Sequence, residues 1–548
     1  MSRPLPRPAT AGVPLSDLAA RVGASGGAGP VRVSGVTLDS RAVRAGDLYA
    51  ALPGFHVHGA RFAADAVRLG AVAVLTDPAG EALLREEPGT AVDVPVLTVE
   101  RPREVLGSLA AHVYGNAAAA LTMVGITGTN GKTTTAYLID SALRALGRRT
   151  GLIGTVETRI GAERIESVRT TPEATDLHAI LAVMKQRGVD ACVMEVSSHA
   201  LDLHRVDGVV YDVALFTNLS QDHLDFHPSM EDYFRAKAQL FTPERCRAAV
   251  VCVDDPWGAR LAQEVAAAGD VALTTLATTP APPPVVTPVR PTTGPAGRHW
   301  SVEPGDDRAF TLRETGGSRS LRLVSHLPGT FNVANTALAA LALLATGMDA
   351  RSAEAALAAP PVVPGRMEVV APGGPGQPRC IVDFAHTPDA VDAALAALRP
   401  STTGRLIAVL GAGGDRDRAK RPAMGAAAAR HADVVVVTDD NPRSEDPQQI
   451  RGAVLSGARA LVESGAATAT VVLDGGPRAA AIAEAVALAV LTDAEGRGNG
   501  DPPRVDTVVV LGKGHEKGQE ISGVTHPFDD RDAVRAALEA AGGIGARA

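Results

Sequence analysis

The sequence predicts an α/β protein built from three domains, and three observations support this fold class. The chain has 548 residues, whereas a typical domain holds roughly 100–200. Short apolar runs alternate with Ala-rich stretches of helical length, which is typical of parallel sheets covered by helices on both faces. This alternation restarts after a Pro-rich run near residue 360. We therefore expect domains at residues 1–118, 119–358 and 359–548.

The expected elements follow from apolar runs and from the residues that interrupt them. In the first domain, Gly and Pro separate the apolar segments, which predicts a small α/β unit. In the second, a buried strand, a glycine loop and a helix at 133–146 precede further strands and an Ala-rich helix at 332–344. The third domain has the doubly wound pattern of a Rossmann-like sheet. The expected strands lie at 31–38, 47–52, 71–75, 121–127, 191–196, 213–216, 249–253, 380–384, 406–410, 434–438, 469–473 and 507–511.

Two segments are expected to be insertions. Residues 278–297 are rich in Pro, Thr and Ala, and residues 496–503 are rich in Gly and Asp. Such compositions bury little apolar surface, so we expect extended surface loops or disorder there.

Composition excludes several classes of protein. The formal charge is −8, with 53 Lys and Arg against 61 Asp and Glu, and aromatic residues make up 3%. Both values argue against nucleic-acid binding. The four cysteines include no CxxC pair, which favours a reducing cytoplasm over zinc or disulfide scaffolds. No apolar stretch has the length of a signal peptide core or a membrane span. We expect a cytoplasmic monomer without membrane insertion.

A glycine-rich loop between a strand and a helix predicts nucleotide binding. Its glycines let backbone amides surround phosphate oxygens, and the helix N-terminus favours negative charge. Lys132 is expected to reach the β- and γ-phosphates of ATP, and the Thr133 hydroxyl to bind Mg²⁺. Ile126 replaces the first glycine of the strict Walker pattern. The expected phosphate-binding residues are Gly128, Thr129, Asn130, Gly131, Lys132, Thr133 and Thr134.

The loop alone leaves a GTPase, a transporter ATPase, a kinase and a ligase open. A GTPase is disfavoured because the guanine-reading combination of DxxG with NKxD does not accompany the loop.

Further motifs follow the loop in a fixed order along the chain. They are MEVSSHA at 194–200, TNLSQDHLD at 217–225, YFRAKAQLF at 233–241, NVAN at 332–335, PGRME at 364–368 and DFAHTPD at 383–389. Together with TGTNGKTT, this order resembles the Mur ligase family, which also includes folylpolyglutamate synthetase. The resemblance extends from end to end of the chain and implies an ATP-dependent amide ligase that uses Mg²⁺.

The resemblance assigns catalytic roles to Lys132, Glu195, His223 and Lys237. Glu195 follows a buried strand, the position where α/β sheets bind ligands, and with Thr133 it would hold Mg²⁺ through oxygen ligands. His223 would serve a second metal or a phosphate. In the family, the lysine of the AKxxLF pattern is carbamylated, which implies that Lys237 becomes N6-carboxylysine and ligates the second Mg²⁺.

The remaining ATP contacts are also implied by resemblance. Asn332 and Asn335 lie three apart on a helix, so they share one face, and the family places such residues near the adenine. Arg366, Asp383 and His386 come from the third domain. They would approach the ribose and phosphates when the domains close, which would also exclude water.

The first domain resembles the uridine-nucleotide-binding domain of the family members that extend UDP-N-acetylmuramoyl-dipeptide. The residues expected to contact UDP are Leu38, Ser40, Phe55, His56 and Val57. Those expected to hold the muramoyl dipeptide are Thr170, Thr171, Ser197 and Arg205. Two neighbours, Arg169 and Leu203, depart from the family pattern, which has an amide and a Gln there.

Three loops after strands of the third domain are expected to bind the amino-acid substrate. The DNPR run resembles the signature of members that add meso-diaminopimelate. Arg443 can bind the distal carboxylate of that amino acid bidentately, whereas lysine has no such group. Glu516 would accept the distal ammonium. The full expected set is Arg416, Asp440, Asn441, Pro442, Arg443, Gly512 and Glu516.

The implied reaction joins meso-diaminopimelate to the D-Glu of UDP-MurNAc-L-Ala-D-Glu through an acyl phosphate, in cytoplasmic peptidoglycan precursor synthesis. Two alternatives stay open at this point. One is the same ligase chemistry with lysine or another amine, and the other is a non-catalytic partner protein with a Mur-like fold. The latter could have lost Glu195 or Lys237, but both are present.

Overall fold

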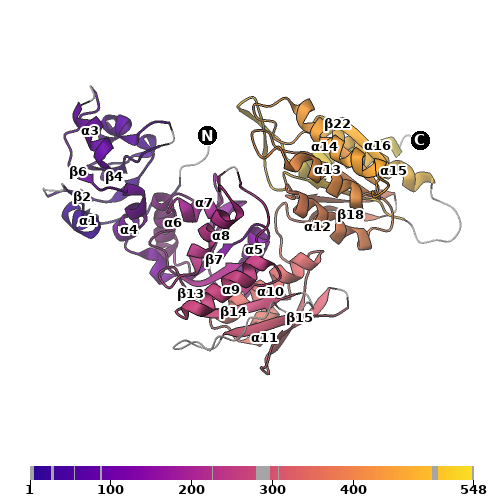
Figure 1. The fold of residues 1–548 in the computed structure, drawn as a ribbon, viewed down its shortest axis with the longest axis horizontal. Coiled ribbons are helices and arrows are strands. Elements are labelled where there is room, and N and C mark those ends of the chain that lie inside the picture. Colours follow the sequence, from indigo (N-terminus) through magenta and orange to yellow (C-terminus); the bar gives the residue numbers. More distant parts are fainter. Residues whose placement is uncertain are drawn as a thin grey trace.

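The structure is a computed structural model that describes residues 5–25, 30–54, 56–86, 89–224, 226–278, 297–306, 308–374, 376–495 and 504–545. Three α/β domains follow one another along the chain, and the first and third lie on opposite sides of the second (Figure 1). The expected α/β class is confirmed. The exact limits at residues 118 and 358 stay a prediction. Of the two expected insertions, 496–503 and all but the end residues of 278–297 lie outside the described residues.

The N-terminal domain contains a four-stranded parallel sheet in the order β3-β4-β5-β6. Three of these strands fall on expected apolar runs, while β6 was not predicted. The strands of the N-terminal domain are β1 (Val13–Pro14), β2 (Arg32–Val33), β3 (Gly35–Thr37), β4 (Asp47–Ala50), β5 (Ala73–Thr76) and β6 (Val96–Thr98). Its helices are α1 (Leu15–Val22), α2 (Ala63–Arg68), α3 (Pro78–Glu86) and α4 (Pro102–Val113).

The central domain contains an 11-stranded sheet in the order β10-β9-β8-β11-β7-β12-β13-β14-β15-β16-β17. Strands β8 to β15 of this order are parallel, and antiparallel pairs extend both edges. The strands are β7 (Thr122–Thr127), β8 (Thr150–Ile153), β9 (Glu157–Ile160), β10 (Glu163–Glu166), β11 (Ala191–Glu195), β12 (Tyr211–Phe216), β13 (Cys246–Cys252), β14 (Ala272–Ala277), β15 (Arg298–Pro304), β16 (Ala309–Glu314) and β17 (Ser320–Val324). The helices are α5 (Lys132–Ala145), α6 (Ala174–Gln186), α7 (Ser198–Asp202), α8 (Met230–Ala238), α9 (Pro256–Ala268), α10 (Thr330–Ala345) and α11 (Ala350–Leu357).

Two hydrophobic cores cover the two faces of the central sheet. Met123 and Val124 are neighbours in β7, yet they belong to different cores, because side chains alternate across a strand. The same alternation separates Cys192 from Val193 in β11. Burial on both faces explains why these strands appear in the sequence as continuous apolar runs.

The C-terminal domain contains a six-stranded sheet in the order β18-β19-β23-β20-β21-β22, parallel except for β18. The carboxyl ends of β19, β20, β21 and β23 therefore meet at one edge. The strands are β18 (Glu368–Gly374), β19 (Gln377–Asp383), β20 (Leu406–Leu410), β21 (Val434–Thr438), β22 (Val471–Gly476), β23 (Thr507–Leu511), β24 (Gly518–Ile521) and β25 (Val524–Pro527). The helices are α12 (Pro388–Leu398), α13 (Lys420–His431), α14 (Pro447–Glu463), α15 (Arg478–Glu495) and α16 (Asp530–Gly545).

In the part of the chain that the structure describes, no helix has both the length and the apolar surface that crossing a bilayer requires.

Candidate active site

The glycine-rich loop connects β7 to α5, as expected. Lys132 begins α5, and its Nζ donates hydrogen bonds to the carbonyl oxygens of Gly128 and Thr129, both at 2.8 Å. Gly131 has a φ of 87°, a conformation that favours glycine. A Cβ at this position would lie 2.4 Å from Oδ1 of Asn335. Both features require glycine where the loop passes against α10.

The TNLS segment after β12 holds the phosphate loop in place. Asn130 donates its backbone N–H to Oδ1 of Asn218 at 2.9 Å, and its carbonyl accepts from Oγ1 of Thr217 at 2.6 Å. The Thr129 N–H donates to the carbonyl of Asn218 at 2.9 Å, and Oγ1 of Thr129 accepts from the N–H of Ser220 at 3.0 Å. The loop is therefore braced by the neighbouring strand end, a role that sequence reasoning did not assign to these residues.

Glu195 lies at the end of β11 with 1% of its surface exposed. Its carboxylate accepts hydrogen bonds from Oγ1 of Thr133 at 3.0 Å and from the N–H and Oγ1 of Thr155 at 2.9 and 3.0 Å. Nη2 of Arg366 also donates to Oγ1 of Thr133 at 3.2 Å. The expected pair of Glu195 and Thr133 is thus brought together as two oxygen donors. Sequence reasoning missed Thr155, since nothing local distinguishes this loop threonine.

Lys237 lies on α8 with 1% of its surface exposed. Its Nζ donates to the carbonyl of Gly128 at 2.9 Å and lies 4.5 Å from the ring centre of Tyr233. Burial, together with the nearby charge of Lys132, holds the pKa of Lys237 well below its usual range. Burial therefore disfavours the protonated form of Lys237 relative to an exposed lysine.

His223 has a φ of 55° and follows Asp222 in the loop after β12. Its ring meets the ring of His199 edge-on at 4.9 Å, and its Nε2 lies 3.6 Å from Oδ2 of Asp222. Among the described residues, no three His, Cys, Asp or Glu side chains form a metal cage. Mg²⁺ bound together with phosphates needs only one or two carboxylates from the protein, so Glu195 fits that kind of site.

Asn332 and Asn335 lie on one face of α10, as expected, with 2% and 4% of their surfaces exposed. Asn335 donates to Oδ1 of Asn332 at 3.0 Å and accepts from Oγ1 of Thr135 at 3.3 Å. The asparagine pair therefore packs against the first turns of α5, behind the phosphate loop.

The C-terminal domain adds charged and aromatic groups to this region. The guanidinium of Arg366 lies 4.3 Å from the ring centre of Phe384. In the described structure, the buried Nε atoms of Arg366 and Arg205 have no hydrogen-bond partner. Asp383 accepts the backbone N–H groups of Met367 and Ala385, at 2.7 and 2.8 Å. Both carboxylate oxygens of Asp383 thus brace the chain around Arg366.

A cavity of about 300 Å³ lies between the central and C-terminal domains. Three histidines and several loop residues from both domains line it, including six of the seven residues expected to bind the amino acid. Pro442 is the expected residue absent from this lining. The lining residues are His199, Asp222, His223, Phe384, His386, Gly411, Ala412, Gly413, Arg416, Asp417, Lys420, Asp440, Asn441, Arg443, Gly512 and Glu516.

Arg443 forms part of the cavity wall with a φ of 52°. Its Nη1 donates to the carbonyl of Gly414 at 2.6 Å, and its Nε lies 3.3 Å from Oε2 of Glu520. Asn441 donates from Nδ2 to Oε2 of Glu516 at 3.0 Å. Loops after β20, β21 and β23 therefore meet here, as predicted, whereas Glu520 was not predicted.

The residues expected to hold the dipeptide cluster beside Glu195. Oγ1 of Thr171 donates to the carbonyl of Glu195 at 2.9 Å and accepts from the N–H of Ser197 at 3.1 Å. Oγ1 of Thr170 lies 3.0 Å from Oγ1 of Thr155. Nη1 of Arg205 donates to the carbonyl of Thr171 at 3.5 Å. Burial lowers the pKa of Arg205, although Glu173 lies 2.9 Å from its Nη2.

The residues expected to contact UDP lie on the N-terminal domain. Leu38 is half-buried after β3, and Ser40 begins a 3₁₀ turn at Ser40–Ala42. His56 and Val57 are exposed. Phe55 lies outside the described residues.

Comparison with known proteins places these features in a family. Three family profiles match, namely "Mur ligase family, catalytic domain" over residues 32–114, "Mur ligase middle domain" over 126–344 and "Mur ligase, glutamate ligase domain" over 365–543.

Two curated relatives, from Streptomyces coelicolor and Corynebacterium glutamicum, are both named UDP-N-acetylmuramoyl-L-alanyl-D-glutamate–2,6-diaminopimelate ligase. The first is 51% identical over 97% of this chain and 98% of its own, and the second is 43% identical over 93% and 92%. A solved structure of a ligase of the same name is 31% identical, with a TM-score of 0.58 over 93% of this chain and 95% of that one. The chain therefore belongs to the Mur ligase family.

Proposed function

We propose that this protein is the ATP-dependent ligase that joins meso-diaminopimelate to UDP-MurNAc-L-Ala-D-Glu during peptidoglycan precursor synthesis. The observation that carries the proposal is the interdomain cavity. The central domain contributes His199, Asp222 and His223 to its wall, and the C-terminal domain contributes Arg416, Asn441, Arg443 and Glu516 among others. A cavity of mixed charge with walls from both domains supports a reaction between substrates held by the two domains. The full-length likeness to relatives named for this reaction agrees with that arrangement.

The residues present fit ATP and Mg²⁺. Thr133 and Glu195 supply oxygen donors of the kind that Mg²⁺ prefers. Lys132, at the N-terminus of α5, and Arg366, with its unpaired Nε, supply positive charge for phosphates. When bound, Mg²⁺ would neutralise phosphate charge in the reacting complex.

The chain's own residues then perform positioning and charge stabilisation. The side-chain carboxylate of D-Glu takes the γ-phosphoryl group of ATP and releases ADP, while Lys132 and Arg366 stabilise the transferring group. The amine of diaminopimelate attacks the resulting acyl phosphate. The C–N bond forms as the C–O bond to phosphate breaks, and the amine loses a proton. The products are the amide, ADP and phosphate, and no covalent enzyme intermediate is required.

We assign the UDP-linked dipeptide and diaminopimelate to separate groups of residues. The residues proposed for UDP are Leu38, Ser40, Phe55, His56 and Val57. Thr170, Thr171, Ser197 and Arg205 are proposed to hold the dipeptide, supported by their hydrogen bonds around Glu195. Diaminopimelate is proposed to lie in the cavity, with Arg416 and Arg443 toward carboxylates and Glu516 toward an ammonium.

We propose that Lys237 is carbamylated. Its neutral amine can add to CO₂ with loss of a proton, which replaces a buried amine by an anionic oxygen donor beside the phosphate loop. Incubation with ¹³C-bicarbonate should give a carbamate resonance that is absent from Lys237→Met. The same spectrum from both proteins would refute the assignment.

We further propose a cytoplasmic monomer. Four free cysteines, all buried, agree with a reducing compartment. Sedimentation equilibrium at micromolar concentration tests the oligomeric state.

The decisive experiment measures ADP release and amide formation with each substrate omitted in turn. We expect ADP release only when ATP, UDP-MurNAc-L-Ala-D-Glu and meso-diaminopimelate are all present. Efficient amide formation with L-lysine and none with diaminopimelate would overturn the choice of amine. Absence of ADP release with every amine would instead support a non-catalytic protein.

A further inference from the structure

Lys513 is a fully buried lysine that contacts two residues of the cavity wall, and the mechanism above does not use it. It lies in the loop after β23, two residues beyond the end of that strand, with 0% of its surface exposed. A lysine is almost never fully buried unless its ammonium is paired. The partners of Lys513 therefore indicate what this unusual burial achieves.

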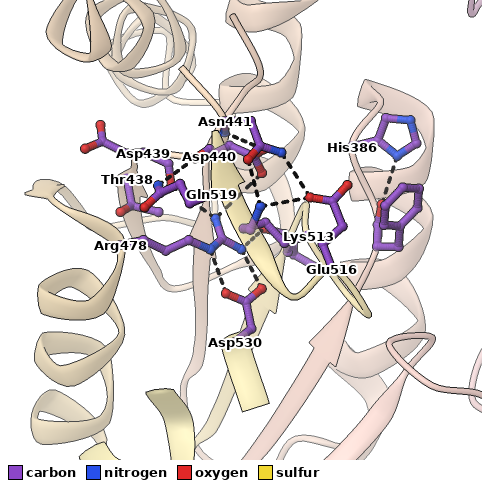
Figure 2. Close-up of polar contacts among 12 residues, drawn as sticks. His386, Thr438, Asp439, Asp440, Asn441, Arg478, Lys513, Glu516, Gln519 and Asp530 are labelled. Carbon is purple, nitrogen blue, oxygen red and sulfur yellow. Dashed lines mark hydrogen bonds and ion pairs between the residues drawn. The ribbon is translucent and has the colours of Figure 1, made fainter. Parts of the chain in front are cut away.

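Both of its hydrogen-bond partners line the cavity. Nζ of Lys513 donates to Oε2 of Glu516 at 2.8 Å and to Oδ1 of Asn441 at 3.0 Å. Asn441 in turn donates from Nδ2 to the same Oε2 at 3.0 Å, and its Oδ1 also accepts the N–H of Glu520 at 3.0 Å. Figure 2 shows the ammonium between the carboxylate and the amide. These contacts fix which end of the Asn441 amide is the donor.

A second buried group holds the backbone beneath this triad. Arg478 and Asp530 are both fully buried, and the Nε and Nη2 atoms of Arg478 each donate to a carboxylate oxygen of Asp530 at 2.7 Å (Figure 2). Nη2 of Arg478 also donates to the carbonyl of Leu511 at 2.9 Å, and Nη1 to the carbonyl of Asp439 at 3.3 Å. Those two carbonyls begin the loops that carry Lys513 and Asn441. The backbone of these two loops is thus held independently of Lys513. The contacts of Lys513 therefore act on the side chains of Asn441 and Glu516.

We propose that Lys513 is a positioning residue for the amine substrate. It engages Oε2 of Glu516 and leaves the rest of the carboxylate, whose side chain is 35% exposed, to accept a substrate ammonium. It also keeps the Asn441 amide in one orientation. Lys513 does not line the cavity and acts through these two residues. The inference rests on the proposed amine-binding role of this pocket.

Kinetics of Lys513→Met test the proposal, with Lys517→Met as the matched control, because Lys517 is exposed in the same loop. Loss of a charged hydrogen bond at a ligand-orienting group should raise the KM for diaminopimelate about 10- to 100-fold. The KM values for ATP and UDP-MurNAc-L-Ala-D-Glu should stay at the wild-type level, as should all constants of the control. An unchanged KM for diaminopimelate, or an equal rise for all three substrates, would overturn the proposal.

A double-mutant cycle with Glu516→Gln separates positioning from general support of the fold. If Lys513 acts through Glu516, Lys513→Met should add little to the effect of Glu516→Gln. Additive effects on the KM for diaminopimelate would refute action through this carboxylate. If Lys513→Met does not fold, Lys513→Gln, which retains a donor, replaces it in the cycle.

The single variant Glu516→Gln distinguishes this inference from the proposed function. A raised KM for diaminopimelate in Glu516→Gln, without one in Lys513→Met, would overturn only the role of Lys513. No effect from Glu516→Gln would remove the assignment of the pocket itself.

Discussion

Lys237 is a single residue of the candidate site whose burial is energetically unfavourable. Its amine is buried beside Lys132, and one carbonyl and one aromatic ring contact it. An amine in this setting costs folding free energy, because burial and a like charge both disfavour its protonation. Residues that lower the stability of the fold are typical of functional sites.

Replacing Lys237 with Met should therefore stabilise the fold and abolish amide formation. For protein kept free of CO₂, we expect a gain of about 1–3 kcal/mol in the free energy of unfolding near neutral pH, since Met fills a similar volume without a buried amine whose protonation burial disfavours. The folded-state pKa of Lys237 lies below its unfolded value, so between these two values the unfolded chain binds the additional proton. Wild-type stability consequently rises with pH across that window, and the advantage of Met shrinks.

Denaturant unfolding of the wild type and Lys237→Met at several pH values measures this difference. Lys185→Met, at an exposed position on α6, is the control and should leave both stability and activity unchanged. A Lys237→Met variant that is less stable at every pH would contradict the prediction.

Arg443 allows a second prediction at the residue scale. Arg443→Lys keeps the charge but loses the planar fork that can bind a carboxylate bidentately. We expect the KM for meso-diaminopimelate to rise about tenfold, with the KM for ATP unchanged. Steady-state kinetics against Arg459→Lys, an exposed residue of α14, provides the comparison. An equal rise for both substrates would indicate general damage to the domain.

At the scale of elements, continuous apolar runs made several buried strands predictable, although β8 and β9, which are also buried along their whole length, were missed. The expected bounds 406–410, 434–438 and 507–511 coincide with β20, β21 and β23, each buried along its whole length. Strands β10 and β17 were missed because exposed residues separate the few buried ones in these short edge strands. Whether such a short segment forms a strand depends on its packing against neighbouring strands in the sheet.

The same distinction applies to the candidate site. Glu195, Asn441 and Glu516 belong to recognisable motifs, and the structure brings them to the expected loops. Thr155 contacts Glu195, 40 positions away, and Lys513 contacts Asn441, 72 positions away, in addition to Glu516 in its own loop. No local pattern encodes the two long-range contacts, so these could only be found in three dimensions.

Thr155 offers a prediction for the loop between β8 and β9. Its N–H and hydroxyl orient Glu195, and Thr155→Val removes the hydroxyl while keeping the volume. We expect kcat to fall about tenfold, with the free energy of unfolding changed by less than about 1.5 kcal/mol.

The matched control for Thr155→Val is Thr158→Val. It removes a buried hydroxyl that contacts Ser167 at 3.3 Å and lies outside the Glu195 network. Equal losses of kcat in both variants would show that the hairpin, and not the orientation of Glu195, determines the rate.

At the scale of the whole molecule, the central domain carries the phosphate loop and the proposed dipeptide site. The N-terminal domain carries the proposed UDP contacts, and the C-terminal domain carries the residues proposed to bind diaminopimelate. The net charge of −8 gives no indication that the proposed ligands are anionic. We propose that individually placed cations such as Lys132, Arg205 and Arg366 bind them. Arg366 comes from the C-terminal domain yet contacts Thr133 in α5. Charge stabilisation at the phosphate loop thus depends on how the two domains approach each other.

Arg366→Lys should consequently impair catalysis through domain closure. Lysine retains the charge but loses the planar contact with Phe384 and the reach of the guanidinium to Thr133. We expect kcat to fall about 10- to 100-fold while the KM for diaminopimelate stays unchanged, because Arg416, Arg443 and Glu516, which are proposed to bind it, all belong to the C-terminal domain. Arg379→Lys, at a residue of β19 that contacts Ser401, should leave kcat unchanged.

Small-angle scattering connects this kinetic effect to the whole molecule. With a non-hydrolysable ATP analogue and UDP-MurNAc-L-Ala-D-Glu, the wild type should become more compact, and Arg366→Lys should do so less. If the variant compacts like the wild type but has a low kcat, Arg366 stabilises charge in the transition state and has no role in domain closure. If the variant keeps wild-type kcat, charge stabilisation at the phosphate loop does not require Arg366 of the C-terminal domain. Domain closure would then serve to position the amine substrate.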